Sequence, residues 1–355
     1  MTVFSIFFAI LLFSLLIFIH EFGHFIAAKL SKVRVNEFSM FMGPAIFKKQ
    51  KGETLYAIRC IPIGGYCAME GEDEDTDDPH SFQKAAWWKR LIILVAGSGM
   101  NLIAGFLLLM IFFSTVTAYT VPVIEEVEPG CTIVSEEGLH ASDRFVKIDG
   151  FQVYTASDAN LLLQFGGETM DIVVERDGKK LSFEDYPMQK HTFVNEQTGA
   201  EEERYGFSFG AQEMTLGGLI PYTWNSTLST VQSVWLSLKM LFTGQAGVKD
   251  ISGPVGIVKI MSDTASAAGN FGDAILNMVY FGGFIAINLG VMNLLPIPAL
   301  DGGRCVGLLL TTGIQAVTKK KLNPKIEGYI HAGGMILLLI LMAVIMFKDV
   351  LFIFK

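Results

Sequence analysis

Charged residues are scarce in this chain: Asp, Glu, Lys and Arg make up 17% of its 355 residues, and 51% are hydrophobic. A typical soluble domain carries about 25% charged residues. Disorder requires high charge and low hydrophobicity, so this composition excludes a disordered chain and argues against a fully water-soluble protein. Basic residues are also few, 27 against 35 acidic ones. Because nucleic-acid binders normally carry a basic patch, we expect no nucleic acid among the partners.

Cysteine is equally scarce, with four residues in the chain: Cys60, Cys67, Cys131 and Cys305. They form no CxxC pair, and only Cys131 lies in the segment that is assigned below to the extracytoplasmic side. No disulfide is therefore expected there. Internal repeats are lacking as well, which counts against a transporter built from inverted repeats.

The hydrophobic residues gather in four blocks, at about residues 3–30, 91–116, 274–300 and 329–347. Each block has the roughly 20 residues that a helix needs to cross a hydrocarbon core. The sequence therefore predicts four transmembrane helices. The first block has no basic region before it and is too long for a signal peptide, so that interpretation is rejected.

Lys and Arg predict the orientation, because cytoplasmic loops carry more of them. Ten lie between the first two spans, mostly near the membrane, and five lie between the last two. The long middle segment also has ten, but they are spread thinly among about twice as many acidic residues. The two shorter loops should be cytoplasmic, and the middle segment and both termini should be outside.

The chain is thus expected to be a polytopic α-helical membrane protein with a membrane-associated β-hairpin region and an inserted extracytoplasmic α/β domain. The expected order is transmembrane helix 1 (1–32), a cytoplasmic-side β-hairpin region with an acidic loop (33–87), transmembrane helix 2 (88–118), the extracytoplasmic domain (119–210), an amphipathic extracytoplasmic helical segment (211–270), transmembrane helix 3 (271–303), a cytoplasmic loop (304–327) and transmembrane helix 4 (328–355).

The extracytoplasmic domain has strand-like runs at 121–127, 145–148 and 170–175, separated by Gly, Asp and Pro. The order of its motifs resembles a bacterial PDZ domain, and the alternative is another small α/β domain. Ser142 stands where such domains usually have Gly, so we expect a tight or strained turn there. Beyond the domain, apolar residues between Trp224 and Phe242 recur every three or four positions, which is typical of one face of a helix. This helix lies on the outer membrane surface or packs on the domain.

Residues 33–69 contain two further strand-like runs, at 38–47 and 55–61, followed by Gly64 and Gly65. They directly follow the first span, so the hairpin is placed to fold back against the membrane. The acidic run at 70–78 is most simply a solvated linker, with a cation site as the weaker alternative.

The sharpest motif is His20-Glu21-Phe22-Gly23-His24, near the cytoplasmic end of the first span. His residues four positions apart share one helix face and can both ligate Zn²⁺, and the adjacent Glu can accept a proton from metal-bound water. The motif is short and occurs by chance, but ionisable residues in an apolar span point to function. A structural His–Glu pair and a proton relay are the alternatives.

Catalytic zinc needs a third protein ligand and an open fourth position. Asp301 is the best candidate, because spans 1 and 3 both end on the cytoplasmic side, where Asp301 follows Pro296 and Pro298. The two prolines break the helix, and such backbone is tolerated at membrane depth only in a protein interior or a water-filled cavity. The alternatives are that Asp301 is a turn residue facing water, or that His331 is the third ligand.

The HEFGH motif of span 1 and the run from Asn293 to Gly303 (NLLPIPALDGG) together resemble the site-2 protease family of intramembrane zinc metalloproteases. The single PDZ-like insert points to its bacterial RseP-like branch. Gly43-Pro44, IPIGGY at 61–66, Asn101 and GPVGI at 253–257 match as well. The chain departs from the family pattern at Phe41, where Gly is usual, and at Ser98, where Pro is usual.

The resemblance implies a zinc metalloendopeptidase of the bacterial inner membrane that cuts in or near transmembrane segments of substrates already trimmed outside. It implies His20, His24 and Asp301 as zinc ligands and Glu21 as general base. It also implies single-span membrane substrates, with anti-sigma factors and signal-peptide remnants as family-level possibilities, and the lipid bilayer as surroundings. The residues assigned to substrate binding are Asn293, Pro296, Pro298 and Gly43. For Asn293 the alternative is an ordinary interhelical hydrogen bond.

A substrate helix must be unwound before it is cut, and an extended peptide is best held by strand addition, for which the 38–61 hairpin offers an edge. Alternatively the hairpin only shields the site. The resemblance implies that the PDZ-like domain is a gate or size filter on the far side. Two other functions are kept open: a non-enzymatic receptor that captures peptides, and a proton or ion transporter.

Overall fold

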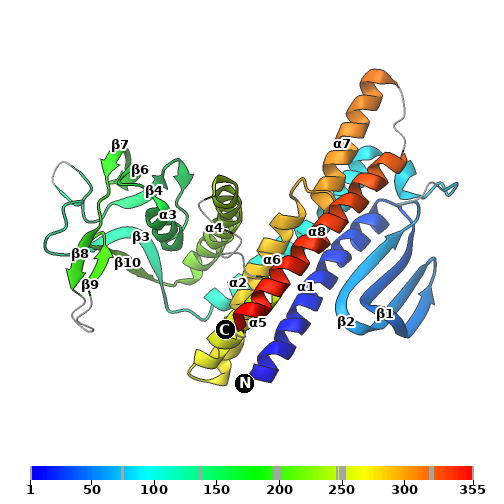
Figure 1. The fold of residues 1–355 in the computed structure, drawn as a ribbon, viewed down its shortest axis with the longest axis horizontal. Helices are drawn as coiled ribbons and strands as arrows, with labels where there is room; N and C mark the ends of the chain where they lie inside the picture. Colours follow the sequence, from blue (N-terminus) through cyan, green and yellow to red (C-terminus); the bar gives the residue numbers. More distant parts are fainter. Residues whose placement is uncertain are drawn as a thin grey trace. The chain divides into compact units, whose positions relative to one another are not determined.

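The fold is seen in a computed structural model, which describes residues 2–72, 76–135, 138–194, 201–244, 247, 253–319 and 324–353. The chain divides into two compact units, residues 1–112 with 234–355, and residues 113–233. The first unit contains most of the long helices, and the second contains a six-stranded sheet (Figure 1). Asp73, Glu74 and Asp75 of the acidic run lie outside the described residues.

Four helices are long and apolar enough to cross a membrane, in agreement with the four hydrophobic blocks. They are α1 (Thr2–Leu30), α2 (Trp87–Phe113), α6 (Phe271–Asn293) and α8 (Pro324–Ile353). The apolar stretches within them are Phe7–Leu30, Trp87–Phe113, Phe271–Asn293 and Gly328–Asp349. The prediction of a membrane protein with four candidate spans is confirmed.

Glycines let these helices approach one another closely. A Cβ added to Gly105 of α2 would lie 2.5 Å from Cγ1 of Ile287 and 2.9 Å from the carbonyl oxygen of Gly283, both in α6. A Cβ added to Gly23 of α1 would lie 2.4 Å from the carbonyl oxygen of Ala96 in α2. Small residues at such crossings are typical of helices packed in a membrane. They bring α1, α2 and α6 together.

The segment after α1 forms the antiparallel strands β1 (Val35–Lys51) and β2 (Thr54–Met69), which are longer than the predicted runs. Three stretches of pairing are present: 35–42 with 61–69, 45–51 with 54–59, and 37–40 with 55–58. Phe41 and Gly43 adopt left-handed backbone, with φ of 70° and 85°, where β1 bends between its two paired stretches. This conformation costs a residue with a side chain about 1–2 kcal/mol. Phe41 therefore carries backbone strain.

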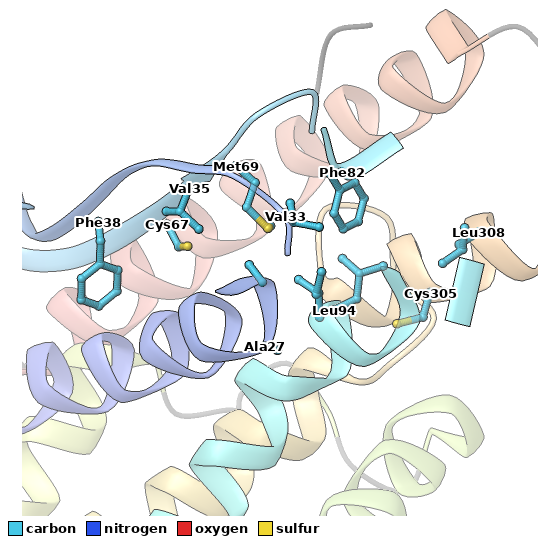
Figure 2. Packing of buried hydrophobic residues seen from close by; sticks show 12 residues of the cluster. Ala27, Val33, Val35, Phe38, Cys67, Met69, Phe82, Leu94, Cys305 and Leu308 are labelled. Atoms are coloured by element: carbon cyan, nitrogen blue, oxygen red, sulfur yellow. The ribbon is translucent and has the colours of Figure 1, made fainter. Parts of the chain in front are cut away.

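Buried apolar side chains join this sheet to the helices (Figure 2). The cluster consists of Ala27, Ala28, Val33, Val35, Phe38, Cys67, Met69, Phe82, Ile93, Leu94, Cys305 and Leu308. Its members come from α1, α2 and α7 as well as from both strands. The cluster therefore holds β2 against the half of α1 that carries the two histidines.

Shorter elements of the first unit are the 3-10 helix η1 (Phe82–Lys84), α5 (Pro254–Ala267) and α7 (Asp301–Thr318). The segment expected to be a cytoplasmic loop (304–327) is helical up to Thr318. Cys305 and Leu308 are buried in the cluster, and such packing stabilises a helix that lacks a long apolar run. The helix ends before Lys319, whose φ is 57°.

The second unit contains a six-stranded sheet with the strand order β10-β3-β4-β6-β7, in which β5 pairs with β4, and a separate β8-β9 pair. The strands are β3 (Ala118–Val127), β4 (Arg144–Ile148), β5 (Phe151–Gln152), β6 (Thr169–Arg176), β7 (Lys179–Pro187), β8 (His191–Val194), β9 (Glu201–Arg204) and β10 (Phe207–Glu213). Helix α3 (Ala156–Phe165) begins with a capping box formed by Thr155 and Asp158. This is a mixed α/β fold.

The turn before β4 has the strain that its sequence predicts. Ser142 adopts left-handed backbone with a φ of 77°. The following Asp143 is fully buried, and its Oδ1 lies 2.7 Å from Nε of Arg176 in β6. This ion pair ties the strained turn to the neighbouring strand.

Helix α4 (Leu216–Thr243) covers most of the predicted amphipathic stretch. Its polar side packs on the domain: Thr223 is fully buried, and Oγ of Ser229 donates to Oδ1 of Asp158 at 2.6 Å. Trp224 and Trp235 are each 55% exposed. The helix thus packs on the α/β domain through hydroxyl groups, and its two tryptophans are exposed. The two predicted arrangements, packing on the domain and contact with the membrane surface, are therefore compatible.

Candidate metal centre

His20 and His24 lie one turn apart on the same face of α1, and both are buried at 7% exposure. Their ring centroids are 4.8 Å apart, and their Nε2 atoms are 3.1 Å apart. Both rings lie against α2, where Nδ1 of His24 donates to the carbonyl oxygen of Ile93 at 2.8 Å. The helix spacing of the motif therefore brings two imidazole nitrogens to one point.

Asp301 reaches the same point from the third span. Helix α6 ends at Asn293, and the chain turns through residues 294–300 before α7 begins at Asp301. A Cβ on Gly302 would lie 2.3 Å from two backbone carbonyl oxygens of this turn, and one on Gly303 would lie 2.3 Å from a third. The two glycines therefore let the turn fold back on the start of α7, which directs Asp301 toward α1.

The three ligand atoms form a nearly equilateral triangle. Oδ2 of Asp301 lies 3.0 Å from Nε2 of His20 and 3.3 Å from Nε2 of His24. Among the described residues, these three side chains are the one group of His, Cys, Asp or Glu spaced to hold a metal ion.

Zinc fits this donor set. Two ligand atoms that are each about 2.0 Å from a tetrahedral zinc lie roughly 3.3 Å apart. Oδ2 of Asp301 is buried, and no described residue gives it a well-aligned hydrogen bond, so a cation would satisfy it. Two histidines and one carboxylate are a known donor set of catalytic zinc, and they leave a fourth position for the reaction.

Glu21 follows the first ligand in α1 and is held from the sheet. The backbone N–H of Cys67 in β2 donates to Oε2 of Glu21 at 3.1 Å. A Cβ on Gly65 would lie 3.8 Å from Cγ of Glu21 and 2.9 Å from the carbonyl oxygen of Ser39. The carboxylate is thus positioned by β2 as well as by its own helix.

Two cysteines near the site have raised pKa values. Burial, with a contribution from the Glu21 carboxylate, raises the pKa of Cys67 well above its ordinary value. Burial, with a contribution from Asp301, raises the pKa of Cys305 to about 11.

The residues predicted to bind substrate lie at the end of α6, in the turn before Asp301 and in β1. Asn293 is the last residue of α6 and is partly exposed, and no described residue forms a hydrogen bond with its side chain. Pro296 and Pro298 lie in the turn before Asp301, and Pro298 packs on α8, where a Cβ on Gly334 would lie 2.4 Å from its Cβ. The carbonyl oxygen of Gly43 accepts from Nη1 of Arg59 at 2.5 Å.

His331, the alternative third ligand, belongs to α8, and its side chain lies outside the described part of the structure.

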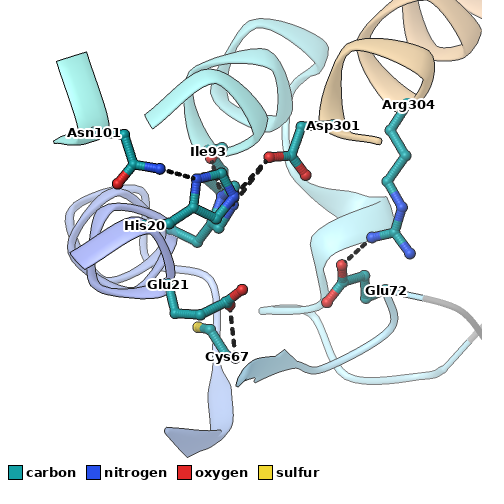
Figure 3. Close-up of polar contacts among 9 residues, drawn as sticks. His20, Glu21, Cys67, Glu72, Ile93, Asn101, Asp301 and Arg304 are labelled. Atoms are coloured by element: carbon teal, nitrogen blue, oxygen red, sulfur yellow. Dashed lines mark hydrogen bonds and ion pairs between the residues drawn. The ribbon is translucent and has the colours of Figure 1, made fainter. Parts of the chain in front are cut away.

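Several residues at the centre carry no role in the sequence-based prediction. Gly97 of α2 lies against both imidazoles, and Nδ2 of Asn101 lies 3.2 Å from Nδ1 of His20. Arg304 forms an ion pair with Glu72, which links the start of α7 to the segment after β2 (Figure 3). In the sequence, only the family match of Asn101 and the glycines of the run AGSGMN point to these residues. Neither feature indicates that Gly97 and Asn101 contact the two histidines of α1.

Two imidazoles and a carboxylate around one point, with a glutamate beside them and membrane-spanning helices around them, define a metallopeptidase of the membrane. The model of the family described as Peptidase family M50 matches residues 8–341. A putative zinc metalloprotease of Clostridium acetobutylicum is 38% identical and is aligned over 99% of both chains. A second one, from Clostridium perfringens, is 33% identical over 98% of both chains. The regulator of sigma-W protease RasP of Bacillus subtilis is 26% identical over 96% of this chain and 97% of its own.

The chain therefore belongs to peptidase family M50. It is an intramembrane zinc metalloprotease, and its cofactor is Zn²⁺. The predicted enzyme class, cofactor and membrane localisation are confirmed. The comparisons lend no support to the receptor and transporter alternatives.

Proposed function

We propose that His20, His24 and Asp301 hold the catalytic Zn²⁺ of this protease and that Glu21 is its general base. The observation that supports this proposal is the triangle of Nε2, Nε2 and Oδ2 atoms, 3.0 to 3.3 Å apart. Bound there, Zn²⁺ supplies a Lewis acid that polarises the scissile carbonyl and activates water for attack.

Glu21 takes the proton of the attacking water and passes it to the leaving amine nitrogen. The hydrogen bond from the N–H of Cys67 restricts the rotamer of its carboxylate, so less orientation has to be gained during the reaction. Asn293 holds the substrate backbone or the developing oxyanion. Its partly exposed side chain, without a hydrogen bond among the described residues, favours this role over an interhelical contact.

The substrate binds as an added strand. An intact helix keeps its carbonyl groups in hydrogen bonds, so the cleaved segment must be extended, and strand addition is a common way to hold an extended peptide. Residues 61–69 are a suitable edge, because in the described sheet they pair with 35–42 on one side. Cys67 turns its N–H away from that partner toward Glu21. A strand added there lies beside the general base. Pro296, Pro298 and Gly43 contact the bound substrate in this proposal.

The substrates are single-span membrane proteins that have already been trimmed outside. Anti-sigma factors are one such class, supported by the relative named regulator of sigma-W protease, and signal-peptide remnants are another. The unit at 113–233 acts as a single PDZ-like domain of the RseP-like branch, placed outside the bacterial inner membrane as a gate or size filter. The uneven distribution of Lys and Arg supports this orientation, with the metal centre toward the cytoplasm.

The substitution Glu21→Gln tests the general base. It removes the proton acceptor and keeps the shape of the side chain, so the purified variant should retain stoichiometric zinc and lose cleavage of a model single-span substrate. Glu53→Gln, which alters an exposed ion pair with Lys29, should keep both properties. Unchanged cleavage in Glu21→Gln would contradict the proposed base. His24→Ala and Asp301→Ala should each lose zinc, and full affinity in Asp301→Ala would show that the third ligand is wrong.

A further inference from the structure

Helix α2 supplies a buried amide directly behind one of the proposed zinc ligands. Asn101 is fully buried, and its Nδ2 lies 3.2 Å from Nδ1 of His20 (Figure 3). Nε2 of the same ring faces Asp301 at 3.0 Å. The amide therefore contacts the nitrogen of His20 that does not point to the metal centre.

Each of the two histidines needs a hydrogen-bond acceptor for the ring nitrogen that does not bind the metal. A neutral imidazole binds a metal through the nitrogen without a proton, and its other nitrogen must donate its proton to an acceptor. His24 meets this requirement, because Nδ1 donates to the carbonyl oxygen of Ile93, which can only accept. His20 needs an acceptor at Nδ1 in the same way, and Asn101 is the residue that contacts this atom.

The amide of Asn101 can present either an acceptor or a donor to the ring. Its oxygen and nitrogen are exchanged by a 180° rotation, and the surrounding hydrogen bonds decide between the two orientations. With Nδ2 toward the ring, Oδ1 is buried and has no hydrogen-bond partner among the described residues. That orientation also opposes an NH₂ group to the N–H that a zinc-binding His20 carries. The unpartnered Oδ1 and the two opposed donors both favour the orientation in which Oδ1 of Asn101 faces Nδ1 of His20.

We infer that Asn101 is a positioning residue of the metal centre: its side-chain carbonyl accepts a hydrogen bond from Nδ1 of His20 and holds the tautomer that presents Nε2 to Zn²⁺. This inference rests on the ligand set proposed above. Mutation of the hydrogen-bond partner of a zinc-binding histidine typically lowers metal affinity by about 10–100-fold.

Two substitutions of Asn101 separate the hydrogen bond from its packing. Asn101→Leu keeps a similar volume without an acceptor, and we expect about 10–100-fold weaker Zn²⁺ binding in competition with a chromophoric chelator. Asn101→Asp keeps the acceptor, and its affinity should stay within about threefold of the original protein or exceed it. The visible absorption of the Co²⁺-loaded protein gives a second readout, because it reports the ligand geometry. It should change in the Leu variant and persist in the Asp variant.

Asn288→Leu is the matched control, because it makes the same change in α6, where Nδ2 of Asn288 donates to the carbonyl oxygen of Phe284. It should leave zinc affinity unchanged. Original affinity in Asn101→Leu would overturn the inference while the proposed ligands stand. If Asn101→Leu does not fold, weak binding by a folded Asn101→Asp variant overturns it instead. A protein with unaltered sequence that binds no stoichiometric zinc would overturn both the ligand set and the role of Asn101.

Discussion

The approach of α2 to the two histidines depends on the absence of a side chain at Gly97. A Cβ added there would lie 2.3 Å from Nε2 of His24, 2.7 Å from Cε1 of the same ring and 2.9 Å from Cε1 of His20. Nε2 is the atom proposed to bind zinc. The substitution Gly97→Ala therefore places a methyl group against the ligand itself.

The size of the effect follows from these distances. Ordinary van der Waals contact for a Cβ begins at 3.4 Å, so the ring or the helix must move by roughly 1 Å, whereas metal–ligand distances tolerate only about 0.2 Å. We expect zinc affinity to fall at least about tenfold, and kcat/KM to fall by about 100-fold, which is typical of a 1 Å misplacement. Helix propensity alone predicts that Gly97→Ala stabilises α2, because Ala is favoured over Gly by about 1 kcal/mol in a helix.

Gly99 offers a control on the same helix, because a Cβ there has nothing within 4 Å. Gly99→Ala should keep both zinc content and activity. Both variants are to be purified in detergent and compared by metal analysis, by chelator competition and by cleavage of a model single-span substrate. If Gly97→Ala retains zinc and activity as Gly99→Ala does, the close approach of α2 to the histidines is not a feature of the active protein, and the reasoning fails.

Two further predictions concern stability, measured by thermal unfolding of the full chain in detergent. Ser142→Gly should stabilise the protein by about 0.5–1 kcal/mol, because the relief of left-handed backbone strain outweighs the greater entropy of the unfolded chain. The control Ser182→Gly, within β7, should destabilise the protein. A lower melting temperature for Ser142→Gly would contradict the strain at Ser142. Asp349→Ala should cost about 1 kcal/mol. Oδ2 of Asp349 accepts from the N–H of Gly256 at 3.0 Å and so caps α5, whose N-cap residue Gly253 has no side chain. Asp349→Asn should keep most of this stability, and equal melting of the Ala variant would refute the cap.

Much of the architecture follows from patterns that are local in sequence. The length of an apolar run decides whether a helix spans the bilayer, and the four candidate spans agree with the four blocks. The helical period brings His20 and His24 to one face. Asp301 was predicted by topology, since alternate spans end on the same side of the membrane. Helix α7 was missed, because its stability comes from burial of Cys305 and Leu308 against other elements rather than from its own apolar content.

The sequence alone determined the class of protein, the number of candidate spans and the residue types of the proposed metal centre, because these depend on composition, period and spacing along one chain. The tertiary structure decided what surrounds the centre: the fold of β1 and β2 that brings the N–H of Cys67 to Glu21, the glycine that admits two imidazoles, and the amide behind His20. His20 and Asn101 are 81 residues apart. Contacts of this kind arise from the packing of one helix on another, and no local period or spacing encodes them.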